Sequence, residues 1–156
     1  MASRRTLRFA SLDDAVADAE HLLAMGYDKA GCWDLAQCCF HMAEWMRFPM
    51  DGFPKAPAPI RLMLWMARNS IGPKLLRKYL ADGMPAGKPT LPQTVPLSGG
   101  NDAAAVNGLK ETVERVRTFA GPPLPSPLFG SMHRSTWVRL NCVHAAHHLS
   151  FLVPKS

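Results

Sequence analysis

The stretch that decides the fold is Trp137–Phe151, WVRLNCVHAAHHLSF. We expect it to be a helix, and at about 100° per residue His144 and His148 then fall on the same side as Trp137 and Asn141. Residues four positions apart on a helix have Cβ atoms about 5–6 Å from each other. The two imidazoles can therefore converge on one metal ion, whose bonds to nitrogen are about 2.0–2.1 Å long. A third ligand has to come from another segment.

The composition is that of a globular protein. The chain has 156 residues, which predicts one domain over 1–156, and it is 47% apolar and 19% charged. No apolar run reaches the roughly 20 residues that span a bilayer, and the arginine pair near the start is not followed by the apolar region of an export signal. We therefore expect a cytoplasmic protein with no membrane partner. In that compartment four thiols without C-x-x-C spacing stay reduced: Cys32, Cys38, Cys39 and Cys142.

The net charge of +6 is too modest, and too little interleaved with aromatic residues, for a nucleic-acid-binding protein. Much of it lies in residues 55–88, where Asp82 is the single acid. This basic segment is either an anion-receptive rim over a site or a solvated face. Its cations are Lys55, Arg61, Arg68, Lys74, Arg77, Lys78 and Lys88.

Four main amphipathic helices are predicted. Capping-box patterns begin the first helix at Ser11, ending near Gly26, and the second at Asp34. The second helix is expected to stop at Phe48, because Pro49 follows. A third helix begins at 101–102 and ends before the Gly-Pro-Pro run at 121–123, and the last is the one that carries the histidine pair.

The segment between the second and third main helices is an insertion. Residues 49–59 and 83–100 are rich in proline and glycine, which predicts loops, and Ile60–Met66 and Lys74–Leu80 predict short helices. No strand is predicted. The fold expected is all-α, a four-helix bundle with a short helical and Pro-rich insertion.

His41 is the candidate third ligand, because it lies mid-face on the second predicted helix. Gln37 and Glu44 flank it and are candidates to orient a ligand or to move a proton. Three neutral imidazoles leave coordination positions open for water or substrate. Zinc, nickel, iron(II) and manganese all accept such ligands.

Alternatives to this site stay open at this point. His144 and His148 can instead be histidines satisfied by hydrogen bonds. His147 is a candidate to replace His148 or to move protons. Cys38, one turn from His41, is a further ligand, an oxidation-sensitive thiol or a small buried residue.

The pattern of one histidine on an early helix and an H-x-x-x-H pair on the last one resembles the DinB/YfiT-like family of metal-binding four-helix bundles. His41 in CFHMAEW and His144 and His148 in HAAHHLSF match that pattern. Further stretches resemble one uncharacterised branch of that superfamily: Arg5–Asp14, Trp33–Gln37, Met50–Pro54 and Pro127–Gly130.

This resemblance implies the bundle fold, a three-histidine metal site and a homodimer. Members with known activity are metal-dependent transferases that pass groups to or from low-molecular-weight thiols. The wider family has Arg-Gly-Gln after the last histidine, whereas Leu149–Phe151 stands there in this chain.

Three functional hypotheses follow. The first is a hydrolase or thiol-linked transferase, in which a divalent ion activates water or a thiol against a small-molecule substrate, itself a thiol or an anion. The second is a non-catalytic bundle that binds a ligand or partner and keeps a structural or vestigial metal site. The third is a stress-linked regulator that binds anionic partners through residues 55–88.

Overall fold

The computed structural model describes residues 3–88 and 90–155, and it is mostly helical, as the sequence predicts. None of the helices in these residues is long and apolar enough to cross a membrane. The α-helices of the described part are α1 (Leu12–Met25), α2 (Leu35–Asp51), α3 (Ala58–Ser70), α4 (Gly72–Asp82), α5 (Asp102–Thr118) and α6 (Arg134–Leu149). A short 3₁₀-helix, η1 (Pro92–Thr94), and two strands, β1 (Tyr27–Lys29) and β2 (Leu152–Pro154), complete the elements.

The predicted helix starts are confirmed by their caps. Ser11 and Asp14 form a capping box at α1, and Asp34 and Gln37 form one at α2. The Asn101 side chain accepts a hydrogen bond from the backbone of α5. These side chains satisfy amide groups that have no partner inside the helix, so they fix where each helix begins.

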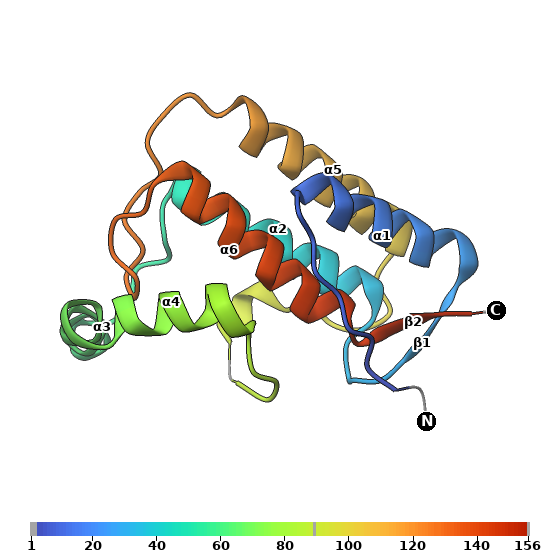
Figure 1. Ribbon diagram of the computed structural model, residues 1–156, viewed down its shortest axis with the longest axis horizontal. Helices are drawn as coiled ribbons and strands as arrows, with labels where there is room; N and C mark the ends of the chain where they lie inside the picture. The colour runs from blue at the N-terminus through green and yellow to red at the C-terminus, as the bar shows by residue number, and fades with distance from the viewer. Residues whose placement is uncertain (1–2, 89, 156) are drawn as a thin grey trace.

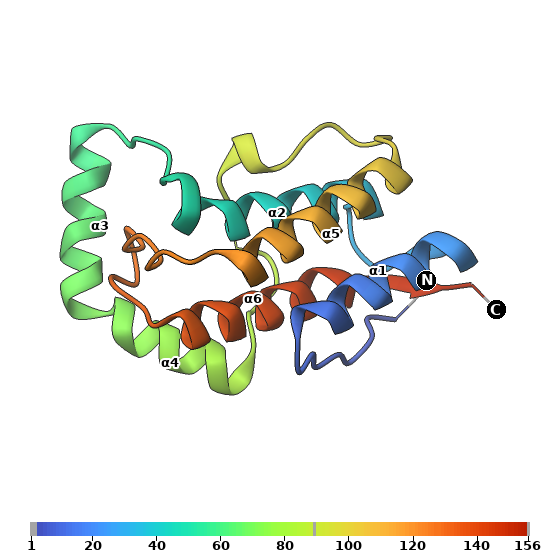
Figure 2. The ribbon, with the colours of Figure 1, turned by 90° about the horizontal axis from the view of Figure 1, so that it is seen from above.

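The core lies between α1, α2, α5 and α6, which contact one another (Figures 1 and 2). Their apolar stripes meet there, as the 3.6-residue spacing predicts. The largest apolar side chains that are almost completely buried are Leu22, Leu35, Met42, Met46, Leu109, Trp137, Leu149 and, on β2, Leu152. The arrangement brings α2 beside α6, the two helices that carry the histidines.

The insertion forms α3 and α4, both longer than the sequence predicts. Helix α4 packs against α6, whereas α3 contacts α4 and has no buried residue. Figure 2 shows α3 at one end of the molecule, running across the direction of the other helices. The predicted insertion is therefore present, and one of its helices lies outside the core.

Two predictions of local structure are wrong. Helix α2 does not end at Phe48 but continues through Pro49 to Asp51. A proline in the last turn of a helix removes one backbone N–H donor, whereas its carbonyl can still accept a hydrogen bond. The Pro49 carbonyl accepts from the backbone N–H of Leu124 (2.8 Å). The chain also has strands, since β1 and β2 pair antiparallel with Tyr27 opposite Pro154. Each strand has three residues, too few for a periodic pattern.

The prediction of one domain over residues 1–156 stays a prediction, and residues 1, 2, 89 and 156 lie outside the described part.

Candidate metal centre

Three imidazoles meet where α2 and α6 pack together. The Nε2 atom of His144 lies 3.2 Å from Nε2 of His41 and 2.9 Å from Nε2 of His148. One ring nitrogen from each residue lies within 4.8 Å of the other two. Two ligands of a tetrahedral zinc ion with bonds of about 2.05 Å stand about 3.3 Å apart. The three predicted residues are therefore close enough to hold one ion.

Thr94 fixes which nitrogen of His41 points at this cluster. The Thr94 hydroxyl donates its single proton to the backbone carbonyl of Leu91 (2.7 Å). The same oxygen lies 2.9 Å from His41 Nδ1, so it accepts and His41 Nδ1 donates. A neutral imidazole with its proton on Nδ1 presents a lone pair at Nε2, the atom that faces His144.

Hydrogen bonds alone satisfy this cluster poorly. Nε2 of His41 has no proton to give, so only Nε2 of His144 can donate in that contact. That one N–H would then have to be shared with Nε2 of His148. A cation in the middle accepts all three lone pairs at once, which is the arrangement of metal-bound histidines.

Aromatic side chains surround the cluster. The Trp33 ring is stacked on the His148 ring, with centroids 5.0 Å apart and planes 4° from parallel. Trp33 also meets the edge of His41 (5.0 Å), and Trp45 lies beside His41 and His144 (6.1 and 6.2 Å). This packing restricts the rotation of the imidazole rings.

Burial keeps the three imidazoles neutral. It lowers the pKa of His41 to about 4, with His41 itself almost completely buried. Burial also lowers the pKa of His144 and of His148 well below the usual value, and the neighbouring imidazoles lower both further. Neutral imidazole is the form that binds metals, so protons compete little with a metal at neutral pH.

The cluster of residues that could hold a metal ion has three members in the described part of the chain. Two of them, His144 and His148, are partly exposed. Cys38 is not a member: its thiol is buried and is directed at the backbone carbonyl of His148 (4.0 Å), and burial raises its pKa. A metal held here would keep coordination positions for ligands from solvent.

The two residues predicted to assist the ligands contact other groups. The Gln37 side chain accepts from the backbone of Asp34 (3.1 Å) and donates to the carbonyl of Pro96 (2.9 Å). The Glu44 carboxylate pairs with Arg47 (2.9 Å). Gln37 thereby ties the segment after η1 to α2. A catalytic role for either residue stays a prediction.

His147 points away from the cluster's donor atoms. Its Nδ1 lies 3.0 Å from the backbone carbonyl of Met84 and 3.2 Å from the guanidinium of Arg4. Its ring stands nearly perpendicular to that of His148. His147 therefore links α6 to the chain after α4 and to the N-terminal segment, and it is not among the three convergent residues.

Sequence reasoning missed Thr94 and Trp33 as parts of the site. Thr94 lies in a stretch without periodicity, so nothing in the sequence predicts a buried hydroxyl there. Trp33 lies just before the N-cap of α2, outside any predicted helix, so the sequence does not indicate that it stacks on His148 of α6.

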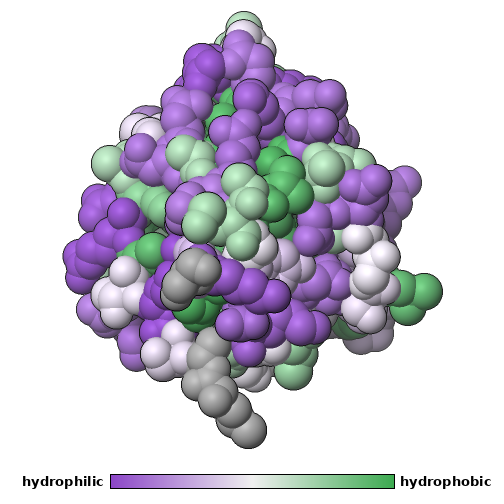
Figure 3. Space-filling model, turned by 90° about the vertical axis from the view of Figure 1, so that its right-hand side faces the viewer, coloured by the Kyte–Doolittle hydropathy of each residue, from purple (hydrophilic) through white to green (hydrophobic). Residues whose placement is uncertain are grey.

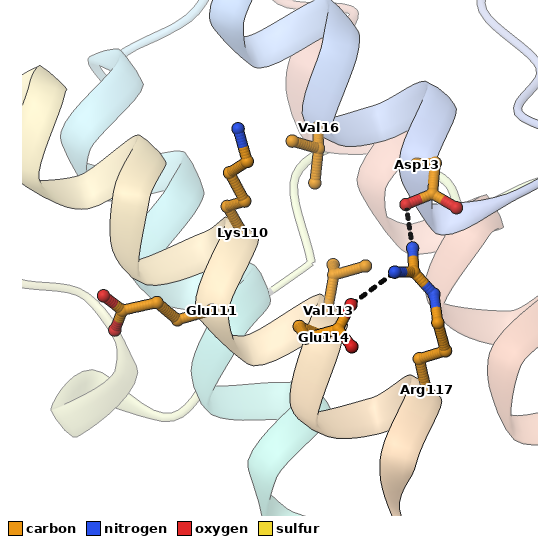
Figure 4. Close-up of a pocket in the computed structure, with 7 residues that line it drawn as sticks. All are labelled: Asp13, Val16, Lys110, Glu111, Val113, Glu114 and Arg117. Atoms are coloured by element: carbon orange, nitrogen blue, oxygen red, sulfur yellow. Dashed lines mark hydrogen bonds and ion pairs between the residues drawn. The ribbon is translucent and has the colours of Figure 1, made fainter.

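A hollow of about 520 Å³ lies elsewhere, between α1 and α5 (Figure 4). Arg117 crosses it and pairs with Asp13 and Glu114. Lys110, on its rim, pairs with Glu20 (2.8 Å). Its two cations are thus paired with acids within the protein, and none of the three histidines lines it.

Comparison with known proteins gives one match. No curated protein and no solved structure matches the chain. One family model matches residues 1–155, nearly all of the sequence. The chain therefore belongs to the family described as Protein of unknown function (DUF1569).

Proposed function

We propose that the chain binds a divalent metal ion through His41, His144 and His148 and uses it on a small molecule, as a hydrolase or a thiol-linked transferase. The observation that carries the proposal is the convergence of three Nε2 atoms, with the lone pair of His41 directed inward by Thr94. We propose further that the packed helices are a DinB/YfiT-like bundle. The histidine from α2 and the pair from α6 support this.

The metal, when bound, supplies Lewis acidity, which lowers the pKa of water or of a thiol at the site. The protein's own residues give the rest. Thr94 and Trp33 hold His41 and His148 in place. The partial exposure of His144 and His148 gives a small molecule a route to the site. Proton transfer by Glu44 requires its pair with Arg47 to open.

A second function is a non-catalytic protein in which the metal is structural. It is favoured by the burial of His41 and by the way the cluster joins α2 to α6, since a bound ion would cross-link two core helices. A structural site is closed by four protein ligands, whereas a catalytic one keeps an exchangeable position. Cobalt(II) in place of the native ion distinguishes the two, because its visible spectrum changes when a small thiol binds at an open position.

The metal prediction is tested on protein purified without a nickel column. We expect one divalent ion per chain after metal supplementation, and loss of that ion in His41→Ala, His144→Ala and His148→Ala. His21→Ala, on the surface of α1, is the matched control and should keep the metal. Circular dichroism shows whether each variant is folded. A wild-type protein that remains metal-free under these conditions would contradict the proposal.

A further inference from the structure

Helix α3 exposes an unusual amount of apolar surface. All of its large apolar side chains except Leu64, and the one that follows the helix, are each 45–58% exposed: Ile60, Leu62, Met63, Trp65, Met66 and Ile71. Single exposed apolar residues are ordinary, but a group of them on one short helix marks a binding surface. The opposite end of the molecule, which faces the viewer in Figure 3, is mostly hydrophilic with scattered apolar residues.

A hollow lies beside this helix. It has a volume of about 830 Å³, within the range of small-molecule sites, and residues 53–56 and Pro127 form part of its wall. Helix α3 contributes residues at spacings of three, four and seven, which place them on one side of the helix. Four of them are Arg61, Leu64, Trp65 and Arg68, so cations stand at both ends of an apolar stretch, and Ala58 and Leu62 of the same helix also line the hollow.

The cations of this hollow have no acidic partner. None of the ion pairs found in residues 3–88 and 90–155 involves Lys55, Arg61 or Arg68, and the lining contains no acid. The hollow between α1 and α5 differs, because acids within the protein pair with both of its cations. Arg117 pairs with Asp13 and Glu114 (Figure 4), and Lys110 pairs with Glu20. The hollow at α3 is thus left with an uncompensated positive potential.

The excess charge of the whole chain lies in the same segment. Residues 55–88 hold seven of the 18 lysines and arginines and one of the 12 acids, so the remaining residues hold eleven of each sign. A second copy of this chain seated on α3 would bring like charges together, which is unfavourable. The occupant that fits is therefore anionic as well as apolar.

We propose that the hollow at α3 binds a monomeric amphipathic anion, a compound with a phosphate or carboxylate head and an apolar body. The head is held at one end of this stretch, by Arg61 or by Arg68, because a guanidinium group forms paired hydrogen bonds with such oxygens. The body lies against Trp65 and Phe53, which line the same hollow. This site is separate from the three histidines and does not depend on the metal.

The test is a titration with decyl phosphate at concentrations where it stays monomeric. Trp65 is 57% exposed, while Trp137 is buried, so binding should shift the tryptophan emission to shorter wavelength. We expect saturable binding at least tenfold tighter than that of 1-decanol or of inorganic phosphate. Decanol lacks the anionic head, and inorganic phosphate lacks the apolar body. Equal affinity for decanol and decyl phosphate would overturn the proposal.

Variants locate the site. The double variant Arg61→Gln with Arg68→Gln should bind decyl phosphate about tenfold or more weakly, since a hydrogen bond to a charged group contributes roughly 1.5–3 kcal/mol. Lys110→Gln, in the other hollow, is the matched control and should bind as the wild type does. Isothermal titration calorimetry measures both, and metal content should be unchanged in each. Unchanged affinity in the double arginine variant would overturn the proposal.

Two further outcomes would also overturn it. Binding to vesicles of anionic phospholipid without binding to monomeric decyl phosphate would show that α3 recognises a membrane surface. A dimer that dissociates in Leu62→Ser with Met66→Ser, measured by light scattering, would show that α3 is covered by a second copy. Met25→Ser, an exposed apolar residue of α1, is the control for both measurements.

Discussion

At the scale of single residues, the site depends on a hydroxyl as much as on imidazoles. An imidazole can carry its proton on either nitrogen, and only one tautomer offers the lone pair that a metal needs. The bond from His41 to Thr94 selects that tautomer, and the bond from Thr94 to Leu91 prevents the hydroxyl from donating instead. Thr94 is completely buried, so water cannot replace either bond.

Thr94→Val should weaken metal binding about 10- to 100-fold while keeping the shape of the side chain, because the groups that orient a metal-bound histidine have effects of that size. It should also destabilise the fold by about 1–3 kcal/mol, since His41 Nδ1 loses its acceptor in a buried place. Chelator competition measures the first effect and urea unfolding the second. Thr136→Val on α6 is the control. A valine variant that binds metal as tightly as the wild type would show that Thr94 does not set the tautomer.

The sequence predicts the ligands and misses the residue that orients them, for a physical reason. His41, His144 and His148 lie on regular helices, so their directions follow from 100° per residue. Thr94 lies in η1, three residues long, inside a segment whose path depends on tertiary contacts. One of those contacts, from Gln37 to Pro96, uses a residue that the sequence predicts to orient a ligand or to move a proton.

At the scale of elements, Tyr27 joins the starts of three of them. Its hydroxyl, on β1, donates to Asp102 at the first turn of α5 (3.0 Å) and accepts from the backbone of Leu35 at the first turn of α2 (2.9 Å). Asp102 also accepts from the backbone of Ala36 (2.8 Å). These bonds satisfy amides that a helix start leaves without partners. The acceptors at the start of α2 are side chains from distant segments, so local capping patterns could not predict these hydrogen bonds.

Tyr27→Phe should lower stability by about 1–3 kcal/mol at pH 7, because the Leu35 amide loses its acceptor. Burial raises the pKa of Tyr27 to about 12. A raised pKa means that the folded state holds the proton more tightly. Its contribution to stability is therefore complete below pH 10 and is lost as the pH rises from 10 through 12. Urea unfolding of both proteins between pH 8 and 11.5 checks this. A stability difference that does not shrink across that range would contradict it.

At the scale of the whole molecule, the chain divides into a neutral core region and a basic insertion. The packed helices hold the three histidines, and the insertion carries the excess charge together with the exposed face of α3. The sequence predicts the insertion and its charge. It does not predict that α3 stays outside the core, because the apolar residues of α3 have the composition of a buried helix and only tertiary packing decides where they lie.

Burial of three neutral imidazoles also makes the stability of the whole metal-free protein depend on pH. The pKa of His41 falls to about 4 in the folded state, against about 6.5 when unfolded. The unfolded chain therefore binds more protons below pH 6.5, and stability falls as the pH falls. His41 alone accounts for a loss of about 2 kcal/mol at pH 5, and His144 and His148 act in the same direction.

The measurement is urea unfolding in chelator between pH 7.5 and 5, a range in which carboxylates with lowered pKa values, such as those of Asp14 and Asp51, stay ionised. His41→Gln should reduce the pH dependence, because its side chain takes up no proton, and the remaining slope should come from His144 and His148. His133→Gln, on an exposed residue before α6, should leave the slope unchanged. A wild-type unfolding midpoint that stays constant down to pH 5 would mean that the three imidazoles accept protons in the folded chain. That outcome would contradict the burial of the imidazoles as the cause of their lowered pKa values.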